Sequence, residues 1–390
     1  MTDLLRDLLA ELLAESPQDS ITRTSNTFDR IAQPFERRMV IFGTGHLGKF
    51  VLPAMRRAGI QPLAFCDNNP KKWGTSIDGV EVMSPVKAFA KFGDNACFLA
   101  AVYNSSKIVK QLEDLGCRHI LPYIVFFWKH SESLPGEERL ELPYKILEQA
   151  SEMPSAYALL ADDVSREEFR TQIRWRCLLD YSCLPPHDPP SDMYFAPDLV
   201  RLTPQEVLVD CGAYDGDSIN LFLEKSGGSF QRIYALEPDP ANLKALTATI
   251  AALPAEVAAK VEVMPFALGR EHCTLRFSAN GTVFSKITTD VGGVDVECRA
   301  LDALFEEPIC PTIIKMDIEG AEMEAIPGAS KTIARCRPII AMCAYHRCEH
   351  LWLIPKLLHD ANPDYRIFLR RYAEECWETV YYAIPQERLA

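Results

Sequence analysis

Long hydrophobic runs are missing from this sequence of 390 residues. The longest strongly apolar stretch, residues 120–128, is far shorter than the ~20 residues that a membrane helix needs. The N-terminus carries acids every few residues and has no basic segment ahead of an apolar one, which argues against a signal peptide. The sequence therefore predicts no membrane partner and a cytoplasmic location.

Positive charge is also scarce. The formal net charge is −13, and residues 141–390 hold 24 basic against 38 acidic side chains. Because an excess of negative charge repels the phosphate backbone, nucleic acid is not expected as a partner. The 13 cysteines are odd in number and include no CxxC pair, so we expect free thiols, several of them in the core, and no metal site.

Leucines recur at helical spacing in the first 20 residues, at positions 4, 5, 8, 9, 12 and 13. This pattern predicts one amphipathic N-terminal helix over residues 1–20. Its polar face is mostly acidic, which is unlike a membrane anchor. We expect the helix to pack on its own chain or on a second subunit, which would make a homo-oligomer.

Short apolar strands alternate with helical segments in two regions, residues 38–130 and 206–390. Such alternation predicts an α/β protein with two doubly wound domains. Residues 131–205 differ: charged helical segments are followed by a proline-rich stretch from Pro185 to Pro197. We expect a helical connector that ends in an extended segment lying across a site. Residues 274–279 and 294–301 are expected to form an antiparallel excursion.

The first glycine cluster lies between a predicted strand and a predicted helix and contains Gly43, Gly45 and Gly48. This context is the one that a dinucleotide-binding turn requires, and Asp67 stands at the end of the next strand, where an acid would bind a ribose. The same turn could equally be a structural relic that binds nothing. Residues 38–125 resemble the nucleotide-binding-like N-terminal domains of sugar-modifying enzymes of the sialic-acid O-acetyltransferase type. This resemblance implies a Rossmann-like fold and a nucleotide-sugar site, but no reaction.

The second cluster has acids where the first has none. A strand leads into Asp210, Gly212, Ala213, Tyr214, Asp215, Gly216, Asp217 and Ser218. Three carboxylates here would oppose a diphosphate and favour a cationic ligand such as S-adenosylmethionine. The next predicted strand ends at Glu237 and Pro238, where a carboxylate can accept hydrogen bonds from both ribose hydroxyls.

A third group of acids follows the strand that ends near Lys315. Glu322 and Glu319 could simply complement the dipole of the following helix. Asp317 fits that explanation less well, because it stands at the carboxyl end of the strand, where α/β proteins bind ligands.

Five segments together resemble the FkbM family of S-adenosylmethionine-dependent methyltransferases: VDCGAYDGDS, ALEPDPANL, PFALG, KMDIEGAEMEAIPGA and AYHRCEHLWLIPKLL. The resemblance implies a seven-stranded methyltransferase fold with an antiparallel last strand, and O-methylation of sugars or natural products. By motif, Gly212, Ala213 and Gly216 would form the cofactor turn, and Glu237 would bind the ribose. Members often carry a histidine in the strand written here as FLRRY, where this chain has Arg370 and Arg371.

His346 follows a predicted strand and belongs to the AYH motif of that family. It could be a structural histidine, or it could take a proton from a hydroxyl, and Asp317 or Glu319 could do the same. A histidine base would make activity fall as the pH drops through about 6–7. The spacing of Cys343, His346, Cys348 and His350 differs from that of the usual zinc modules. Tyr194 and Phe195 could cover an acceptor pocket.

We therefore expect an enzyme that moves the methyl group of S-adenosylmethionine to a hydroxyl oxygen of a small molecule or glycan. A nucleotide-sugar dehydrogenase or epimerase built on the first glycine turn is the alternative, and a non-catalytic nucleotide-binding protein is a third. The epimerase is weakened because no Tyr-x-x-x-Lys dyad of the expected kind follows that turn. Tyr103 and Lys107 have this spacing only at a predicted helix start.

Overall fold

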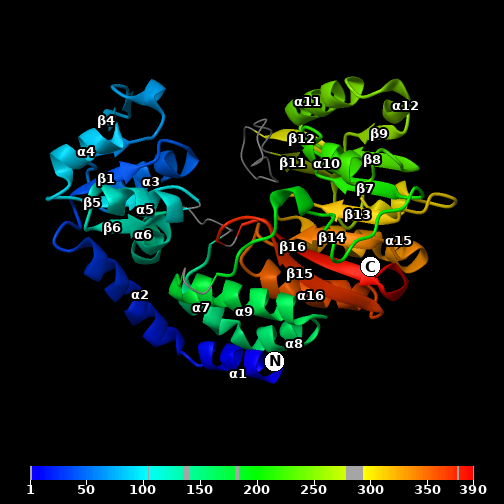
Figure 1. Cartoon of the computed structure of the whole chain (residues 1–390), viewed down its shortest axis with the longest axis horizontal. Helices are drawn as coiled ribbons and strands as arrows, with labels where there is room; N and C mark the ends of the chain where they lie inside the picture. The colour runs from blue at the N-terminus through cyan, green and yellow to red at the C-terminus, as the bar shows by residue number, and fades with distance from the viewer. Residues whose placement is uncertain are drawn as a thin grey trace. The chain divides into compact units, whose positions relative to one another are not determined.

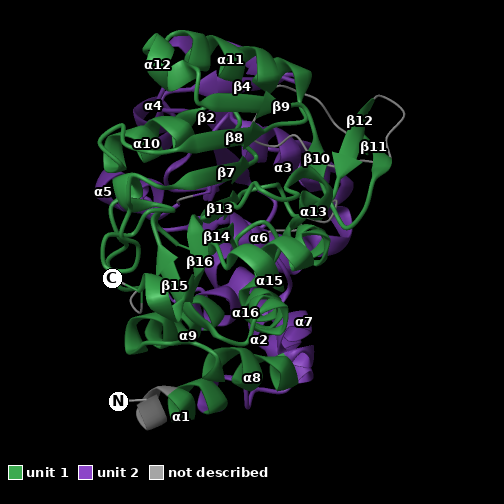
Figure 2. Cartoon of the chain, turned by 90° about the vertical axis from the view of Figure 1, so that its right-hand side faces the viewer, with its two compact units in different colours: residues 1–10, 150–173, 183–390 green, residues 11–149, 174–182 purple. Residues whose placement is uncertain are grey.

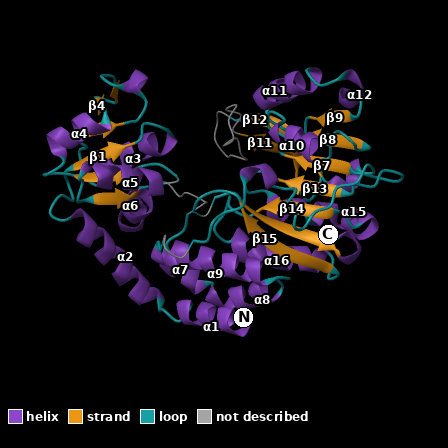
Figure 3. Ribbon diagram, in the orientation of Figure 1, coloured by secondary structure: helices purple, strands orange, loops and turns teal. Residues whose placement is uncertain are grey.

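The computed structural model describes residues 2–103, 105–134, 140–180, 184–277, 293–375 and 377–389. The chain divides into two compact units (Figure 2). Unit 1 comprises residues 1–10, 150–173 and 183–390, and unit 2 comprises residues 11–149 and 174–182. Each unit contains a largely parallel sheet with helices beside it (Figure 3), which confirms the predicted α/β class.

Unit 2 contains a six-stranded sheet of order β3-β4-β2-β1-β5-β6. Strands β4, β1, β5 and β6 of this sheet are labelled in Figure 1. All its pairs are parallel except β3 with β4, which is an antiparallel edge hairpin. The central strand reads MVIF and is fully buried, as expected for a parallel strand covered on both faces. The strands are β1 (Met39–Phe42), β2 (Ala64–Cys66), β3 (Ser76–Ile77), β4 (Val80–Met83), β5 (Cys97–Ala100) and β6 (Ile120–Pro122). The helices are α2 (Pro17–Ala32), α3 (His46–Arg57), α4 (Pro85–Phe92), α5 (Ser106–Leu115), α6 (Tyr123–His130) and α7 (Pro143–Glu148).

The N-terminal segment forms two helices, not the single helix expected over residues 1–20. Helix α1 (Thr2–Leu12) ends early, and α2 begins at Pro17. The hydroxyl of Ser16 accepts a hydrogen bond from the backbone N–H of Asp19 at 3.1 Å, and proline at the first helical position suits a helix start. The leucine spacing ends at Leu13, so it gave no indication that a new helix begins after Ser16.

Unit 1 contains a seven-stranded sheet of order β15-β16-β14-β13-β7-β8-β9. Strand β16 runs antiparallel to both of its neighbours, and the remaining pairs are parallel, so the reversed last strand is confirmed. The strands are β7 (Val207–Cys211), β8 (Arg232–Leu236), β9 (Val261–Met264), β13 (Ile313–Met316), β14 (Ile339–Cys343), β15 (Tyr365–Arg371) and β16 (Thr379–Pro385).

Helices pack along this sheet (Figure 3). They are α10 (Asp217–Lys225), α11 (Pro240–Ala251), α12 (Ala255–Ala258), α13 (Leu301–Leu304), α14 (Glu322–Ala325), α15 (Ser330–Cys336) and α16 (His350–Ala361). A separate three-stranded sheet contains β10 (Ala267–Leu268), β11 (Cys273–Phe277) and β12 (Val294–Arg299). Strands β11 and β12 pair antiparallel, as expected for the excursion, although residues 278–279 of that prediction lie outside the described residues.

The connector between the two predicted domains contains α7, α8 (Met153–Ala158) and α9 (Asp163–Leu178). The division into units falls within α9, after residue 173. Beyond it, the described part of the proline-rich segment carries one short 3₁₀ helix (Pro190–Asp192) and is otherwise extended or turned. No helix among the described residues is both long enough and apolar enough to cross a membrane.

The cysteines depart from expectation at one place. Cys310 and Cys336 form a disulfide whose Cα atoms lie 5.5 Å apart, so the expectation that all thiols are free is wrong for this pair. They are 26 residues apart in sequence and belong to no short motif, so the sequence offered no signal. Eight of the other described cysteines are buried free thiols, and Cys273 is exposed.

Candidate active site

The polar motifs of unit 1 follow four strands that are adjacent and parallel in the sheet, β8, β7, β13 and β14. Because the carboxyl ends of parallel strands meet at one edge, the topology places the turn after β7, the acid after β8 and the two groups after β13 and β14 together. This edge is the candidate active site.

The backbone of the turn after β7 packs closely on the backbone of the segment that follows β13. Gly212 has φ +82°, and a Cβ placed on it would lie 1.9 Å from the backbone oxygen of Asp317. Gly216 has φ +93°, and its Cβ would lie 3.1 Å from a methyl carbon of Thr249. Both positions therefore need glycine for backbone reasons. Ala213, between them, is fully buried.

Asp210 is buried, and its charge is balanced inside the fold. The ammonium of Lys315 lies 2.9 Å from Asp210 Oδ1, and both side chains are buried. Ser218 donates a hydrogen bond to the other oxygen of Asp210, and Lys315 donates to the carbonyl of Gly212 at 2.6 Å. Burial would lower the pKa of Lys315, but the charge of Asp210 raises it above its usual value.

Lys315 is thus a site residue that the sequence analysis did not single out. A lysine in the middle of the apolar strand TIIKM was the available signal, since buried lysines are almost always paired.

Glu237 is 5% exposed at the end of β8. Its carboxylate accepts hydrogen bonds from the backbone N–H of Tyr214 at 3.0 Å and of Asp239 at 2.9 Å, and from the amide of Asn242 at 3.4 Å. Burial nevertheless raises the pKa of Glu237. The carboxylate is therefore fixed in direction. Oε1 accepts two of these bonds, and Oε2 accepts one and keeps a lone pair for a hydroxyl.

The other residues predicted for the cofactor turn lie near it but are less enclosed. Asp215 and Pro238 are half-buried, and Asp217 is exposed at the first position of α10. Tyr214 has φ +47°, an uncommon value that its place in the turn imposes.

A group of carboxylates converges on His346, which is 3% exposed. Its Nδ1 lies 2.7 Å from Glu322 Oε1. Its Nε2 lies 3.1 Å from Asp317 Oδ1 and 3.5 Å from Glu319 Oε1. Glu322 has a fully buried side chain, whereas those of Asp317 and Glu319 are 22% and 21% exposed. The histidine therefore lies behind the two carboxylates that reach the surface of the site.

These neighbours change the protonation of both partners. Burial alone would lower the pKa of His346, but the three carboxylates around it outweigh burial and hold the pKa well above the usual value. Burial would raise the pKa of Asp317, but His346 and Lys315 lower it well below the usual value. At neutral pH this structure therefore contains an imidazolium and a carboxylate, and His346 is not a free base.

Tyr194, in the proline-rich segment, lies over this group. Its hydroxyl donates to Asp317 Oδ2 at 2.7 Å, and the ammonium of Lys315 lies 5.2 Å from the centre of its ring. Tyr345 donates to Asp317 Oδ1 at 3.4 Å. The ring of Phe195 packs at 5.4 Å on that of Phe222 in α10. Tyr194 therefore reaches the polar group, whereas Phe195 packs into the apolar interior.

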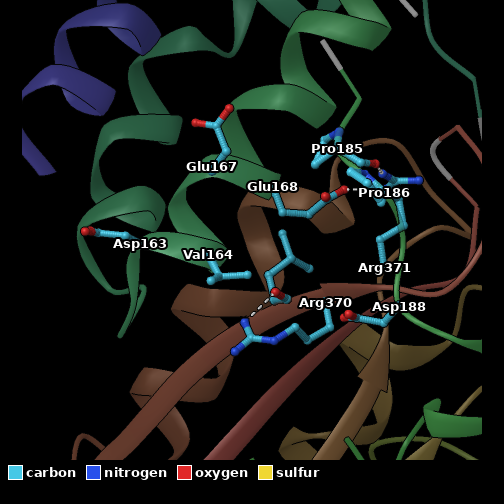
Figure 4. A pocket seen from close by; sticks show the side chains of 10 residues that line it. Asp163, Val164, Glu167, Glu168, Pro185, Pro186, Asp188, Arg370 and Arg371 are labelled. Atoms are coloured by element: carbon cyan, nitrogen blue, oxygen red, sulfur yellow. Dashed lines mark hydrogen bonds and ion pairs between the residues drawn. The ribbon is translucent and has the colours of Figure 1, made fainter. Parts of the chain in front are cut away.

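A cavity of about 410 Å³ lies at the carboxyl end of β15 (Figure 4). Its wall is formed by α9, the start of the proline-rich segment and residues 369–371. Both arginines there are engaged by the chain: Arg370 binds Asp162 and Asp198, and Arg371 binds Glu168. Arg370 and Cys343 both pair with Val380, so the cavity and the His346 group lie at the same edge of the sheet.

Among the described residues, the potential metal ligands that approach one another are Asp317, Glu319 and His346. This group contains His346 but not Cys343, Cys348 or His350.

The first glycine turn, in unit 2, also uses its glycines in distinct ways. Gly43 has φ +103°, and a Cβ on Gly48 would lie 2.0 Å from the carbonyl oxygen of Gly43. A Cβ on Gly45 would meet nothing within 4 Å. Asp67 is held by the side chains of Thr44 and Lys72, with Lys72 Nζ 3.0 Å from its carboxylate.

Comparison with known proteins gives two kinds of match. Residues 210–373 match the family model described as the methyltransferase FkbM domain, which confirms the resemblance seen in the motifs. No curated protein matches the sequence. The crystal structure of methyltransferase FkbM from Methylobacillus flagellatus KT is 22% identical with a TM-score of 0.76, and the match covers 98% of each chain. It shows that the two chains share a fold.

A second solved structure, precorrin-6y C5,15-methyltransferase from Geobacter metallireducens GS-15, is 16% identical. The match covers 48% of this chain and 84% of that chain, with a TM-score of 0.30.

Proposed function

We propose that unit 1 binds S-adenosylmethionine and transfers its methyl group to a hydroxyl oxygen of a sugar, a nucleotide-linked sugar or a natural product. One observation carries the proposal. A glycine turn, a direction-fixed carboxylate at Glu237 and the Asp317–His346 group follow adjacent parallel strands within a match to a methyltransferase domain. The fold and the match to a family model indicate only the class of enzyme, whereas this arrangement of side chains indicates the role of each residue.

The residues present fit the cofactor. Glu237 has a carboxylate oriented by backbone N–H groups, suited to accept from a ribose hydroxyl. Asp215, half-buried in the turn, suits the ammonium of the methionine moiety. S-adenosylmethionine supplies a sulfonium-activated methyl group, so the protein has to align the acceptor oxygen and manage its proton. Asp210 and Lys315 act as positioning residues, because their ion pair ties the turn to β13.

Asp317 is the group that accepts the hydrogen bond of the acceptor's hydroxyl and takes its proton, which becomes strongly acidic as the new C–O bond forms. It is more exposed than His346 and is held from both sides by Tyr194 and His346. His346, buried and cationic, orients Asp317 and stabilises its charge instead of taking the proton directly. The activity profile should therefore lack the inflection at pH 6–7 that a free histidine base would give.

The cavity beside β15 is the acceptor pocket of this proposal. Its volume lies within the range of small-molecule sites. The proline-rich segment contributes both a wall of this cavity and Tyr194, so it links acceptor binding with the orientation of Asp317.

The test is formation of S-adenosylhomocysteine from S-adenosylmethionine in the presence of a panel of sugars, nucleotide sugars and polyketide alcohols. Asp317→Asn should lower turnover by ~100-fold on any acceptor that the wild type uses. Glu324→Gln, whose side chain is 63% exposed in α14, is the matched control and should retain wild-type turnover. Equal turnover of Asp317→Asn and the wild type would contradict the role of Asp317.

Unit 2 favours a second binding function. Gly45 has no packing partner for a side chain, although Gly43 and Gly48 are needed for the turn itself. In a dinucleotide-binding turn the middle glycine lets the backbone approach a pyrophosphate, so we assign unit 2 to a nucleotide-linked group. Gly45→Ala should weaken binding of UDP-, GDP- or CDP-sugars in a thermal-shift assay without lowering the melting temperature of the free protein. Identical shifts in variant and wild type would contradict this assignment.

A further inference from the structure

We infer that Asp317, Glu319 and His346 form a binding site for one hard divalent cation of the Mg²⁺ or Mn²⁺ class. Their donor atoms all lie within 4.8 Å of one another. His346 Nε2 is 3.1 Å from Asp317 Oδ1 and 3.5 Å from Glu319 Oε1. An octahedral ion with bonds of about 2.1 Å separates neighbouring donor atoms by about 3 Å, so only small shifts of the side chains are needed.

A second, independent feature points to a ligand at this place. His346 Nε2 is fully buried, is directed at the two carboxylates and makes no well-formed hydrogen bond. On the other side of the ring, Nδ1 lies 2.7 Å from the buried carboxylate of Glu322. A histidine that binds a metal usually donates its second N–H to such a carboxylate, which fixes the tautomer and presents the other nitrogen as a lone pair. The ion would therefore replace the proton that Nε2 carries in the ion-free structure, and its charge would balance Asp317 and Glu319 in place of the imidazolium.

The charges and donors favour a hard cation over zinc. Three carboxylates meet at one imidazole, and two of them border the surface of the site. Two carboxylate oxygens and one nitrogen leave coordination positions for water or for an oxygen of another molecule, as Mg²⁺ and Mn²⁺ require. The hydroxyl groups of Tyr194 and Tyr345 support Asp317 from outside this set.

The ion site extends the proposed function. Binding of the ion does not depend on that proposal, but the role of the ion in methyl transfer does. A cation at this place would hold the hydroxyl oxygen of the acceptor as a ligand beside the turn after β7, and would make that hydroxyl more acidic. The acceptor class would then be molecules whose reacting hydroxyl has a neighbouring oxygen that can complete the coordination, such as a sugar diol. The cysteine and histidine spacings of the sequence predict no metal, because a site built from two carboxylates and a histidine at two separate strand ends has no such spacing.

The test uses the full chain, stripped with a chelator and studied without cofactor or acceptor. Mn²⁺ is titrated while free Mn²⁺ is followed by electron paramagnetic resonance. We expect one Mn²⁺ per chain, displaced by Mg²⁺. Glu319→Gln should weaken Mn²⁺ binding at least tenfold, whereas Glu324→Gln, which removes the same charge from a 63% exposed side chain in α14, should bind as the wild type does. Melting curves in chelator establish that both variants are folded.

Absence of stoichiometric Mn²⁺ binding, or equal affinities of the wild type and Glu319→Gln, would overturn the site and leave an ion pair between His346 and its carboxylates. A calorimetric titration with S-adenosylhomocysteine in chelator keeps the two proposals apart. Mn²⁺ binding without S-adenosylhomocysteine binding would support the ion site and contradict methyl transfer. S-adenosylhomocysteine binding without Mn²⁺ binding would overturn the ion site alone.

Discussion

The two glycine turns of this chain have the same parts in different surroundings. Each has an aspartate paired with a lysine, Asp67 with Lys72 in unit 2 and Asp210 with Lys315 in unit 1. The side chain of Lys72 is 41% exposed, whereas that of Lys315 is 3% exposed. In unit 2 the pair involves the acid that a ribose would need. In unit 1 the pair stabilises the turn, and the acid for the ribose is a separate residue, Glu237.

The glycines differ in the same way. In unit 1, both Gly212 and Gly216 are required by the protein's own backbone or packing. In unit 2, Gly45 is not: a Cβ there would meet nothing within 4 Å, and the residue is the N-cap of α3. A glycine turn after a buried strand therefore does not have one fixed use, and the contacts that a side chain would make at each glycine distinguish the positions that the fold requires from those open to a ligand.

The largest expected effect concerns stability. Gly212→Ala forces a Cβ into the backbone oxygen of Asp317 at a positive φ, and should lower the free energy of unfolding by at least about 3 kcal/mol. Gly45→Ala should leave it within about 0.5 kcal/mol of the wild type. Chemical denaturation measures both, and hydrogen exchange of the β7 and β13 amides localises the damage to unit 1. Equal loss in the two variants would remove the distinction between the turns.

The next largest difference is expected in the contribution of the two ion pairs to the free energy of unfolding. Lys315→Met leaves Asp210 buried without its partner and should cost about 3–5 kcal/mol of unfolding free energy. Lys72→Met breaks a partly exposed pair and should cost less than about 1 kcal/mol. Urea denaturation of the two variants gives the comparison. A loss from Lys72→Met as large as that from Lys315→Met would show that the burial difference does not govern the two pairs.

The smallest effect is in the pH dependence of stability, and its sign differs between the turns. Burial would raise the pKa of Asp67, but hydrogen bonds from Thr44, Asn69 and Lys72 lower it below the usual value. Its contribution is therefore present above the unfolded pKa of about 4 and is lost as the pH falls through the lower folded value. Burial raises the pKa of Glu237, so the folded state gains from protonation as the pH falls toward about 4–5.

Denaturation midpoints between pH 7 and pH 3 check these signs. Asp67→Asn should flatten the loss at acid pH, and Glu237→Gln should remove the gain. A steeper acid loss in Asp67→Asn than in the wild type would contradict the pairing described for unit 2.

The α/β class and the edge that carries the site could be predicted from the sequence, because strands alternate with helices and the acids follow the strand ends. The order of the strands is given only by the structure. The partners of Asp210 could not, because Lys315 meets it only when β13 lies beside β7. The protonation of His346 was also out of reach, since it depends on three carboxylates that approach it only after folding. The start of α2 has a local signal, Ser16 followed by Pro17, but the leucine spacing was given more weight. The Cys310–Cys336 disulfide has no local signal in the sequence.

The most direct test of the central claim, that the cofactor binds at the turn of unit 1, is calorimetric titration of the full chain with S-adenosylhomocysteine. The wild type and Asp67→Asn should bind one equivalent with equal affinity. Glu237→Gln should bind ten- to a hundredfold more weakly, which corresponds to the ~1.5–3 kcal/mol of hydrogen bonds made to a charged group. Unchanged affinity in Glu237→Gln, or loss of binding in Asp67→Asn, would contradict the claim.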